Sequence, residues 1–125
     1  MIILDSDVLI EILDKRSKRG EEAADRLRET GEEIATTSLN LHEVLYGFEK
    51  ASKKTRALDA IPVLGYDRGD AQLSANLELA TQQRGRTTPR MDAMIAAIAI
   101  NNNATLYTFN REHFEVLAED GLKLL

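Results

Sequence analysis

The sequence predicts an α/β fold with three layers, in which a central parallel sheet is covered by helices on both faces. The chain opens with a continuous apolar run, Ile2–Leu4, which is typical of a central strand buried on both faces. Short strand-like segments then alternate with helical segments, and no internal repeat interrupts them. Met91–Ile100 is apolar on nearly every side, which indicates a buried helix.

The length of 125 residues is enough for one hydrophobic core, so we expect a single domain over residues 1–125. Apolar residues make up 43% and charged residues 30% of the chain, as in ordinary globular domains. The sequence contains no cysteine, which excludes disulfides, zinc–thiolate sites and thiol chemistry. Any metal must therefore be held by oxygen ligands or by the two histidines, and Mg²⁺ or Mn²⁺ is favoured.

The charge and the apolar runs restrict the location and the partners of the protein. A net charge of −5 argues against a general nucleic-acid coat protein, whereas a nuclease stays possible because a metal ion can neutralise an acidic centre. Ile2–Leu4 is too short for a signal peptide, and the longest apolar block, Ala93–Ile100, is too short to span a membrane. We therefore expect a cytoplasmic protein with no membrane contact.

The elements follow from the apolar spacing and from residues that start or end helices. The expected strands are 2–4, 33–37, 62–66, 104–108 and 122–125. The expected helices run from Ser6 or Asp7 through Leu13, over 21–30, from Ser38 or Asn40 through Phe48, from Asp67 or Asp70 to near Gly85, over 91–100 and over 112–117, with a helical or irregular link over 52–61.

Three acidic residues, Asp5, Glu43 and Asp92, and Asn110 lie at predicted strand ends or helix starts. The three acids are far apart in the sequence, so no single local loop can join them. In a parallel sheet, however, the loops that follow the strands emerge at the same edge. Carboxylates gathered there can hold Mg²⁺ and leave positions open for water and phosphate.

Each of these acids also has a purely structural explanation. Asp5 can cap the first helix, Glu43 can close a capping box with Asn40 or face water, and Asp92 can be a first-turn acid that the helix dipole stabilises. Burial argues for function at two of them. A carboxylate at the end of a doubly buried strand, or at the start of an apolar helix, is costly without a cation nearby.

Three arginines, Arg84, Arg86 and Arg90, come just before the apolar helix that Asp92 opens. Their position suggests an anion site beside a metal site. The alternative is that they are ordinary solvated surface residues.

Four segments resemble the PIN domain, and more closely the VapC-type toxins of prokaryotic toxin–antitoxin pairs. The resemblance covers essentially the whole chain. It rests on residues 3–10 (ILDSDVLI), 36–47 (TTSLNLHEVLYG), 84–99 (RGR…DAMIAAIA) and 106–114 (LYTFNREHF).

The resemblance implies a set of site residues. The family's metal-binding acids correspond to Asp5, Glu43 and Asp92, and Ser6 resembles the small hydroxyl residue that usually follows the first acid. The fourth site position, acidic in many relatives, is Asn110 here, which offers a carbonyl oxygen but no charge. The neighbouring acids that are able to compensate are Glu112 and Glu115.

The resemblance also implies an activity and partners. It implies a Mg²⁺- or Mn²⁺-dependent ribonuclease that is commonly a homodimer and is neutralised by a small antitoxin whose tail occupies the acidic groove. A metal held by Asp5 and Asp92 would activate water for in-line attack on an RNA phosphodiester, and Glu43 would hold the metal or orient that water. Arg86 or Arg90 could bind the RNA backbone or stabilise the developing charge, and the alternative is that both are surface residues.

Two alternatives belong to other classes of protein. A haloacid-dehalogenase-like phosphatase also begins with a buried strand that ends in Asp-x-Asp, as Asp5 and Asp7 do here, but it needs a later lysine near an acidic pair. The second alternative is a PIN-like interaction module that kept the fold without catalytic activity. A ribonuclease assay with and without Mg²⁺ separates these alternatives from the enzyme.

Overall fold

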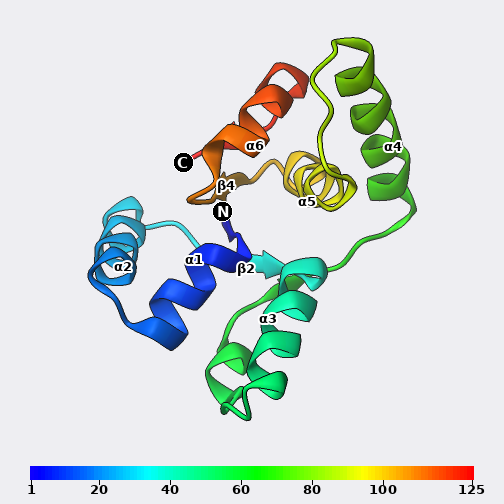
Figure 1. The fold of residues 1–125 in the computed structure, drawn as a ribbon. Coiled ribbons are helices and arrows are strands. Elements are labelled where there is room, and N and C mark those ends of the chain that lie inside the picture. The colour runs from blue at the N-terminus through cyan, green and yellow to red at the C-terminus, as the bar shows by residue number, and fades with distance from the viewer.

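The computed structural model describes residues 1–125 as a five-stranded parallel sheet between two layers of helices (Figure 1). The strand order is β3-β2-β1-β4-β5, and every neighbouring pair is parallel. The strands are β1 (Ile2–Leu4), β2 (Ile34–Thr37), β3 (Val63–Leu64), β4 (Thr105–Tyr107) and β5 (Lys123–Leu124). The predicted fold class is confirmed.

The helices occur where the sequence predicts them, with boundaries shifted by a few residues. They are α1 (Ser6–Ile10), α2 (Lys18–Thr30), α3 (Ser38–Lys50), α4 (Arg68–Gln83), α5 (Arg90–Asn101) and α6 (Arg111–Glu115). A π-helical segment (Glu11–Lys15) continues α1, and 3₁₀ segments occupy Arg56–Ala60 and Val116–Asp120. None of these helices combines the length and the apolar character needed to cross a membrane.

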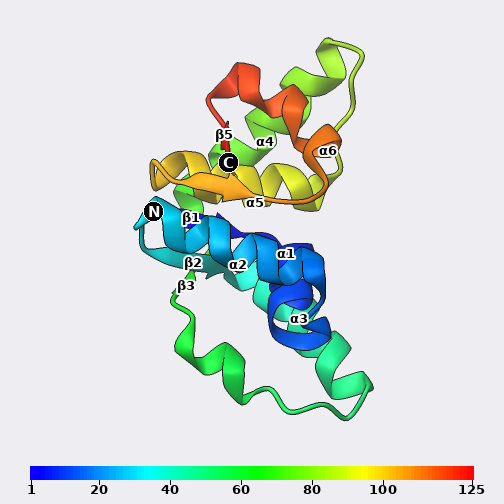
Figure 2. The ribbon, with the colours of Figure 1, turned by 90° about the vertical axis from the view of Figure 1, so that its left-hand side faces the viewer.

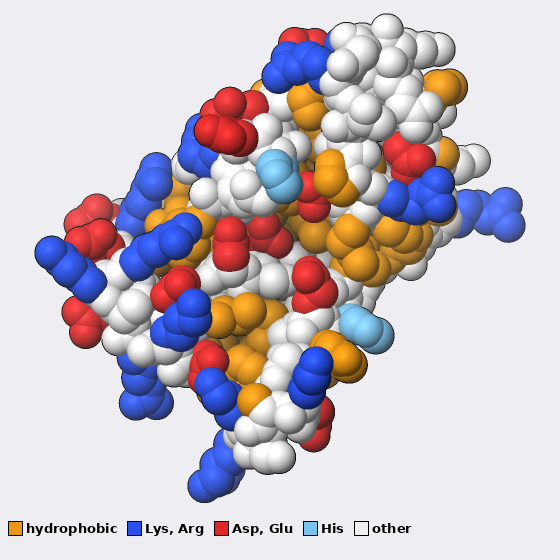
Figure 3. Space-filling view, viewed as in Figure 1, with side chains coloured by type: hydrophobic (Ala, Val, Ile, Leu, Met, Phe, Trp, Pro, Cys, Tyr) orange, Lys and Arg blue, Asp and Glu red, His pale blue; other side chains and the backbone are white.

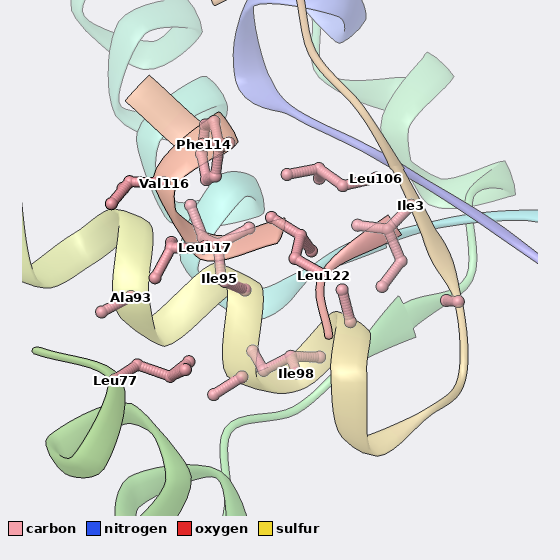
Figure 4. Close-up of a cluster of buried hydrophobic side chains, with 14 residues drawn as sticks. Ile3, Leu77, Ala93, Ile95, Ile98, Leu106, Phe114, Val116, Leu117 and Leu122 are labelled. Atoms are coloured by element: carbon pink, nitrogen blue, oxygen red, sulfur yellow. The ribbon is translucent and has the colours of Figure 1, made fainter. Parts of the chain in front are cut away.

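The central strand β1 divides the core into two halves. Ile3 packs with α4, α5 and α6, whereas Ile2 and Leu4 pack with α1, α2 and α3. Figure 2 shows these two groups of helices on opposite sides of the sheet. The first half contains the apolar helix α5, from which Ile95 and Ile98 point into the cluster drawn in Figure 4. Alternation along a strand that is buried on both faces produces this division.

The caps of α1 and α3 are the residues that join each helix to the strand before it. The N-cap of α1 is Asp5, whose carboxylate accepts a hydrogen bond from the backbone N–H of Ser6, so neither Ser6 nor Asp7 caps this helix. The N-cap of α3 is Thr37, whose hydroxyl accepts from the backbone N–H of Asn40 at 3.1 Å. The predicted capping box from Asn40 to Glu43 is therefore absent. Asp5 is the single residue between β1 and α1, whereas Thr37 is both the last residue of β2 and the cap of α3.

The parallel topology brings distant segments to one edge of the sheet. Asp5 follows β1, Thr37 ends β2 and Thr108 follows β4, so all three lie at the carboxyl ends of their strands. Helix α5 leads back to the start of β4, and its first turn therefore lies near the same edge. Asp92, in that first turn, is placed there by the chain direction alone.

Gly20 lies where α2 comes too close to a neighbouring backbone segment to carry a side chain. A Cβ atom at this position would lie 2.1 Å from the carbonyl oxygen of Glu11, because α2 packs directly on the π-helical segment. Since the obstructing atom belongs to the backbone, a side-chain movement cannot relieve the clash. Only glycine permits this contact.

We predict that Gly20→Ala lowers the free energy of unfolding by about 1–3 kcal/mol, because the methyl group forces α2 away from the π-helical segment. Gly47→Ala is the matched control. A Cβ at Gly47 meets no atom within 4 Å, and this residue lies inside α3, so alanine should stabilise the protein by about 0.4–1 kcal/mol. Urea unfolding of both variants tests the pair. Equal stability of the two variants would contradict the proposed clash.

Candidate metal centre

Three donors hold the carboxylate of Asp5 at the end of β1. Its Oδ1 accepts from the backbone N–H of Ser6 at 2.9 Å and from Asn40 Nδ2 at 2.8 Å. Its Oδ2 accepts from the Thr108 hydroxyl at 2.7 Å. The backbone N–H of Asp5 also donates to the carbonyl oxygen of Tyr107 at 2.9 Å. The carboxylate is therefore fixed by groups from α1, α3 and the end of β4.

Asn40 is the fully buried residue that joins these elements. Its Nδ2 donates to Ser6 Oγ at 3.0 Å as well as to Asp5, and its Oδ1 accepts from the Thr37 hydroxyl at 2.7 Å. All its side-chain groups thus have partners, which fixes the side chain in one orientation. The sequence analysis treated Asn40 only as a capping residue. The missed signal was a polar side chain in the first turn after β2, at the edge where the acids were expected.

Glu43 lies one turn further along α3, at the exposed rim of the site. Its Oε1 accepts from the Ser6 hydroxyl at 2.9 Å. Since Ser6 also accepts from Asn40, a continuous chain of hydrogen bonds runs from Asp5 to Glu43. The structure therefore brings these two predicted acids together through the predicted auxiliary residue Ser6.

Asp92 is the third predicted acid and has the most perturbed environment. It is the third residue of α5, whose N-cap is Pro89, so Asp92 does not cap this helix. Burial, followed by the negative charge of Asp5, raises the pKa of Asp92 from 3.8 to about 6; His113 opposes the shift and Glu43 adds to it. Its side chain is only 18% exposed. The three acids thus share one region, and their like charges repel.

His113 lies against Asp92, with 3.6 Å between His113 Nδ1 and Asp92 Oδ2. His113 is not among the site residues that the sequence predicts. Asn110 Nδ2 also lies 2.8 Å from the same His113 nitrogen. Both contacts converge on one nitrogen, so its proton decides whether His113 pairs with the carboxylate or accepts from the amide. The Asn110-x-x-His113 spacing was the available signal, because it places both side chains on one helical turn.

Asp7 connects α1 to the loop after β4. Its Oδ2 accepts from the backbone N–H of Phe109 at 3.1 Å, whereas its Oδ1 is buried without a hydrogen-bond partner. Burial, and next the charge of Asp5, raises the pKa of Asp7; Arg19 is among the groups that lower it. Asp7 therefore adds a further carboxylate whose charge this chain satisfies only in part.

The acids can form an open metal site but not a closed cage. No group of three or more histidine, aspartate or glutamate side chains is arranged so that it could hold a metal ion by itself. Mg²⁺ needs fewer protein ligands, because it is commonly held by one or two carboxylates and keeps several waters or substrate oxygens. Asp5 and Asp92, whose charges interact, are two carboxylates of the kind that such an ion uses. Figure 3 shows acidic side chains gathered near the middle of one face, which is where a cation would be attracted.

The arginines that precede α5 are engaged with acids in the structure. Arg90 forms two hydrogen bonds with Glu78 at 3.0 and 3.1 Å, and Arg86 lies 3.8 Å from Glu119. Arg84 pairs with Glu119 and Asp120. A phosphate would have to compete with these carboxylates for each guanidinium.

Glu112 and Glu115 lie on α6 and are exposed. They are the acids that were expected to compensate for the uncharged Asn110. Glu115 lies 4.0 Å from Arg111, and the side chain of Glu112 makes no hydrogen bond or ion pair. Neither contacts Asp92, whose neighbour from α6 is His113. The structure thus places a histidine, rather than a second glutamate, beside Asp92.

The family model described as PIN domain matches residues 2–120 of this chain. The chain belongs to the PIN domain family. The match spans β1 to the end of the 3₁₀ segment that follows α6, and it therefore includes every site residue described above. A comparison with curated protein sequences finds no match.

Solved structures support the assignment of this PIN domain. One similar structure is that of VapBC2 from Rickettsia felis bound to a DNA fragment from the promoter. Its matching chain is 25% identical in sequence to this chain, with a TM-score of 0.81, and the alignment covers 100% of this chain and 98% of that one. A chain of FitAcB from Neisseria gonorrhoeae is 20% identical, with a TM-score of 0.84 and coverage of 100% and 96%. A chain of DNA-bound VapBC from Salmonella typhimurium is 23% identical, with a TM-score of 0.79 and coverage of 99% and 96%. The last two show the shared fold.

The PIN assignment replaces the phosphatase alternative. That alternative required a later lysine near an acidic pair, in addition to the opening Asp5 and Asp7. In the structure, Lys53 pairs with Asp14, Lys15 pairs with Glu11, and no lysine forms an ion pair with Asp5 or Asp7. The pair instead contacts backbone and neutral side chains at the carboxyl edge of the sheet.

The raised pKa of Asp92 predicts how stability depends on pH in the metal-free protein. The folded chain keeps this proton to a pH of about 6, whereas the unfolded chain loses it near 3.8, so the free energy of unfolding falls between these values as the pH rises. Asp92→Asn should remove this loss. We expect a gain of about 1–3 kcal/mol at pH 7.5 and none at pH 4.

Thermal unfolding in EDTA at both pH values measures the effect. Glu112→Gln is the control, because it removes a carboxylate from an exposed side chain of α6 that makes no ion pair. Asp5→Asn is a poorer test, because both carboxylate oxygens of Asp5 accept hydrogen bonds. The new amide nitrogen cannot accept, so the variant would lose the bond from Thr108 or the bonds from Ser6 and Asn40 as well as the charge. A gain for Asp92→Asn of the same size at pH 4 and pH 7.5 would show that charge is not its cause.

Proposed function

We propose that this PIN domain is a Mg²⁺- or Mn²⁺-dependent endoribonuclease and the toxin of a toxin–antitoxin pair. The observation that carries the proposal is the convergence of Asp5, Glu43 and Asp92 at the carboxyl edge of the sheet. Two of these acids raise the pKa of the third, and the donors that surround them include no lysine or arginine. Such a site attracts a divalent cation and, through it, a phosphate.

When bound, the cation would supply Lewis acidity at the scissile phosphate and would activate water near neutral pH. Asp5 and Asp92 would hold it, since they are the more enclosed acids, and Asn40 and Thr108 would keep Asp5 oriented. With its pKa near 6, Asp92 is mostly ionised at neutral pH and is able to bind a metal.

Glu43 is suited to accept a proton from the attacking water. Its Oε1 is oriented by the Ser6 hydroxyl, whereas its Oε2 makes no hydrogen bond in the structure. Oε2 can therefore accept a proton from the attacking water while Oε1 stays in place. His113 lies beside Asp92, and Asn110 would hold its ring in place.

The partners are proposed from the neighbours. The R. felis structure contains both proteins of a VapBC pair, and its matching chain covers the whole of this PIN domain at 25% identity. We therefore propose RNA as substrate, a small antitoxin as inhibitor and the cytoplasm as the place of action. A homodimer is supported by Leu79 and Met91, which are 54% and 40% exposed on the adjacent helices α4 and α5.

The decisive experiment is cleavage of single-stranded or looped RNA in Mg²⁺. We expect activity that EDTA abolishes and that added Mg²⁺ or Mn²⁺ restores. Asp92→Asn should lower kcat by about 10²–10³-fold, because a neutral amide replaces a charged ligand, while the fold stays intact. Arg90→Ala should have a milder effect, through KM, because Arg90 is already paired with Glu78.

Circular dichroism of each variant serves as the folding control. A mock purification from cells that do not express the protein controls for contaminating nuclease. If Asp92→Asn cleaves at the wild-type rate, the metal-site assignment is wrong. The PIN domain would then be better described as a non-catalytic interaction module.

Asn40→Ala tests the positioning of Asp5 separately. The substitution removes the donor to Asp5 Oδ1 and Ser6 Oγ, so the Mg²⁺ concentration that gives half-maximal activity should rise about 10–100-fold. Asn102→Ala is the matched control, since the Asn102 amide donates to the Ile98 carbonyl oxygen at the other end of α5. An unchanged Mg²⁺ requirement in folded Asn40→Ala would remove Asn40 from the site.

A further inference from the structure

A second polar cavity adjoins the acidic site across the loop after β4. It has a volume of about 380 Å³ and lies between α2 and the end of the sheet. Its basic side chains are Arg19, Arg26 and Arg111, and its aromatic side chains are Tyr107 and Phe109. We call this cavity the arginine–aromatic pocket.

The two α2 arginines of this pocket contact aromatic rings rather than acids. The Arg19 guanidinium lies 3.8 Å from the centre of the Phe109 ring, and the Arg26 guanidinium lies 5.4 Å from the centre of the Tyr107 ring. Neither arginine forms an ion pair. Stacking holds each guanidinium near a ring and leaves its N–H donors free. This distinguishes them from the paired arginines that precede α5.

The pocket shares its wall with the proposed metal site. The Tyr107 carbonyl oxygen accepts from the backbone of Asp5, and the Thr108 hydroxyl donates to the carboxylate of Asp5. The backbone N–H of Phe109 donates to Asp7, while its ring lies under Arg19. Tyr107, Thr108 and Phe109 thus each contact Asp5 or Asp7 with one group and also line the pocket. A chain that leaves the acidic site on this side meets Arg19 first.

The spacing of the two arginines suits a nucleic-acid strand. Arg19 and Arg26 are seven residues apart on α2, which places them on the same face about 10 Å apart along the helix axis. At about 3.4 Å per stacked nucleotide, this distance spans roughly three nucleotides. An arginine that is stacked on an aromatic ring can bind phosphate with its edge and support a base with its outer face.

We propose that the arginine–aromatic pocket is a subsite for single-stranded RNA, in which Arg19 and Arg26 bind successive stretches of the backbone next to the scissile phosphate. This inference rests on the proposed nuclease function and adds the path of the substrate. Glu22 is the one acidic side chain that lines the pocket, so binding of an anionic strand here depends on the arginines.

The test measures binding and turnover in the full chain. Fluorescence anisotropy with a labelled 12-nucleotide single-stranded RNA in EDTA reports binding without cleavage. We expect Arg19→Ala and Arg26→Ala each to raise Kd about five- to tenfold, and to reduce the slope of log K against log salt by about 0.7. In Mg²⁺, KM should rise by a similar factor, with kcat changing less than about twofold.

Two further variants separate charge, stacking and general effects. Arg28→Ala removes the same charge from α2 at a position that pairs with Asp25, and it should leave Kd and KM unchanged. Arg19→Lys should keep the wild-type salt slope but lose part of the affinity, because lysine keeps the charge and not the planar stacking surface.

The outcomes distinguish this proposal from the proposed function. Wild-type cleavage in Mg²⁺ together with unchanged Kd and KM in Arg19→Ala and Arg26→Ala would overturn the subsite and leave the nuclease standing. Absence of RNA binding and cleavage by the wild-type protein would overturn both. Loss of affinity for a poly-glutamate peptide but not for the RNA would assign the pocket to an acidic protein partner instead, which also overturns the RNA subsite.

Discussion

The site depends on the way the Asp5 carboxylate is held at the end of β1. Its hydrogen-bond donors come from α1, from Asn40 on α3 and from Thr108 after β4, so three parts of the chain must be in register for the carboxylate to be satisfied. A carboxylate at the end of a doubly buried strand is tolerated only with such donors. The same hydrogen bonds that make Asp5 structurally acceptable also fix its direction, which is a requirement for a metal ligand.

The neighbouring acids are not satisfied to the same degree. Asp92 has a histidine rather than a lysine or arginine beside it, and its pKa rises to about 6; Asp7 keeps one buried oxygen without a partner. Ionisation of Asp92 therefore lowers the free energy of unfolding as the pH rises through about 6. Catalytic centres commonly contain such groups, because the energy lost in the free protein is recovered when a cation or substrate binds.

The sequence was sufficient for the architecture and for the three acids. Apolar runs and their spacing gave the strand and helix order, and the topology of a parallel sheet then required Asp5, Glu43 and Asp92 to lie at one edge. The hydrogen-bonding residues around them could not be obtained in this way. Asn40 holds Asp5 because Thr37 caps α3 and leaves the Asn40 amide free to donate to the carboxylate.

Charge was the property that the sequence predicted least well. Arg84, Arg86 and Arg90 precede Asp92 in the chain, yet they pair with acids from α4 and the segment after α6. Their neutralising partners are 12 to 36 residues away, so proximity along the chain did not reveal them. Arginines that are close in the sequence become a candidate anion site only once their acidic neighbours in space are known.

The loop after β4 contacts both the acids of the site and the arginines of the arginine–aromatic pocket. Phe109 supplies its backbone N–H to Asp7 and its ring to Arg19, while Thr108 supplies its hydroxyl to Asp5. A shift of this loop would change the orientation of the acids and the position of the stacked arginine together. In a chain with a net charge of −5, an anionic strand is attracted only where such arginines remain unpaired. The loop places that attraction directly beside the acids at which a cation would bind.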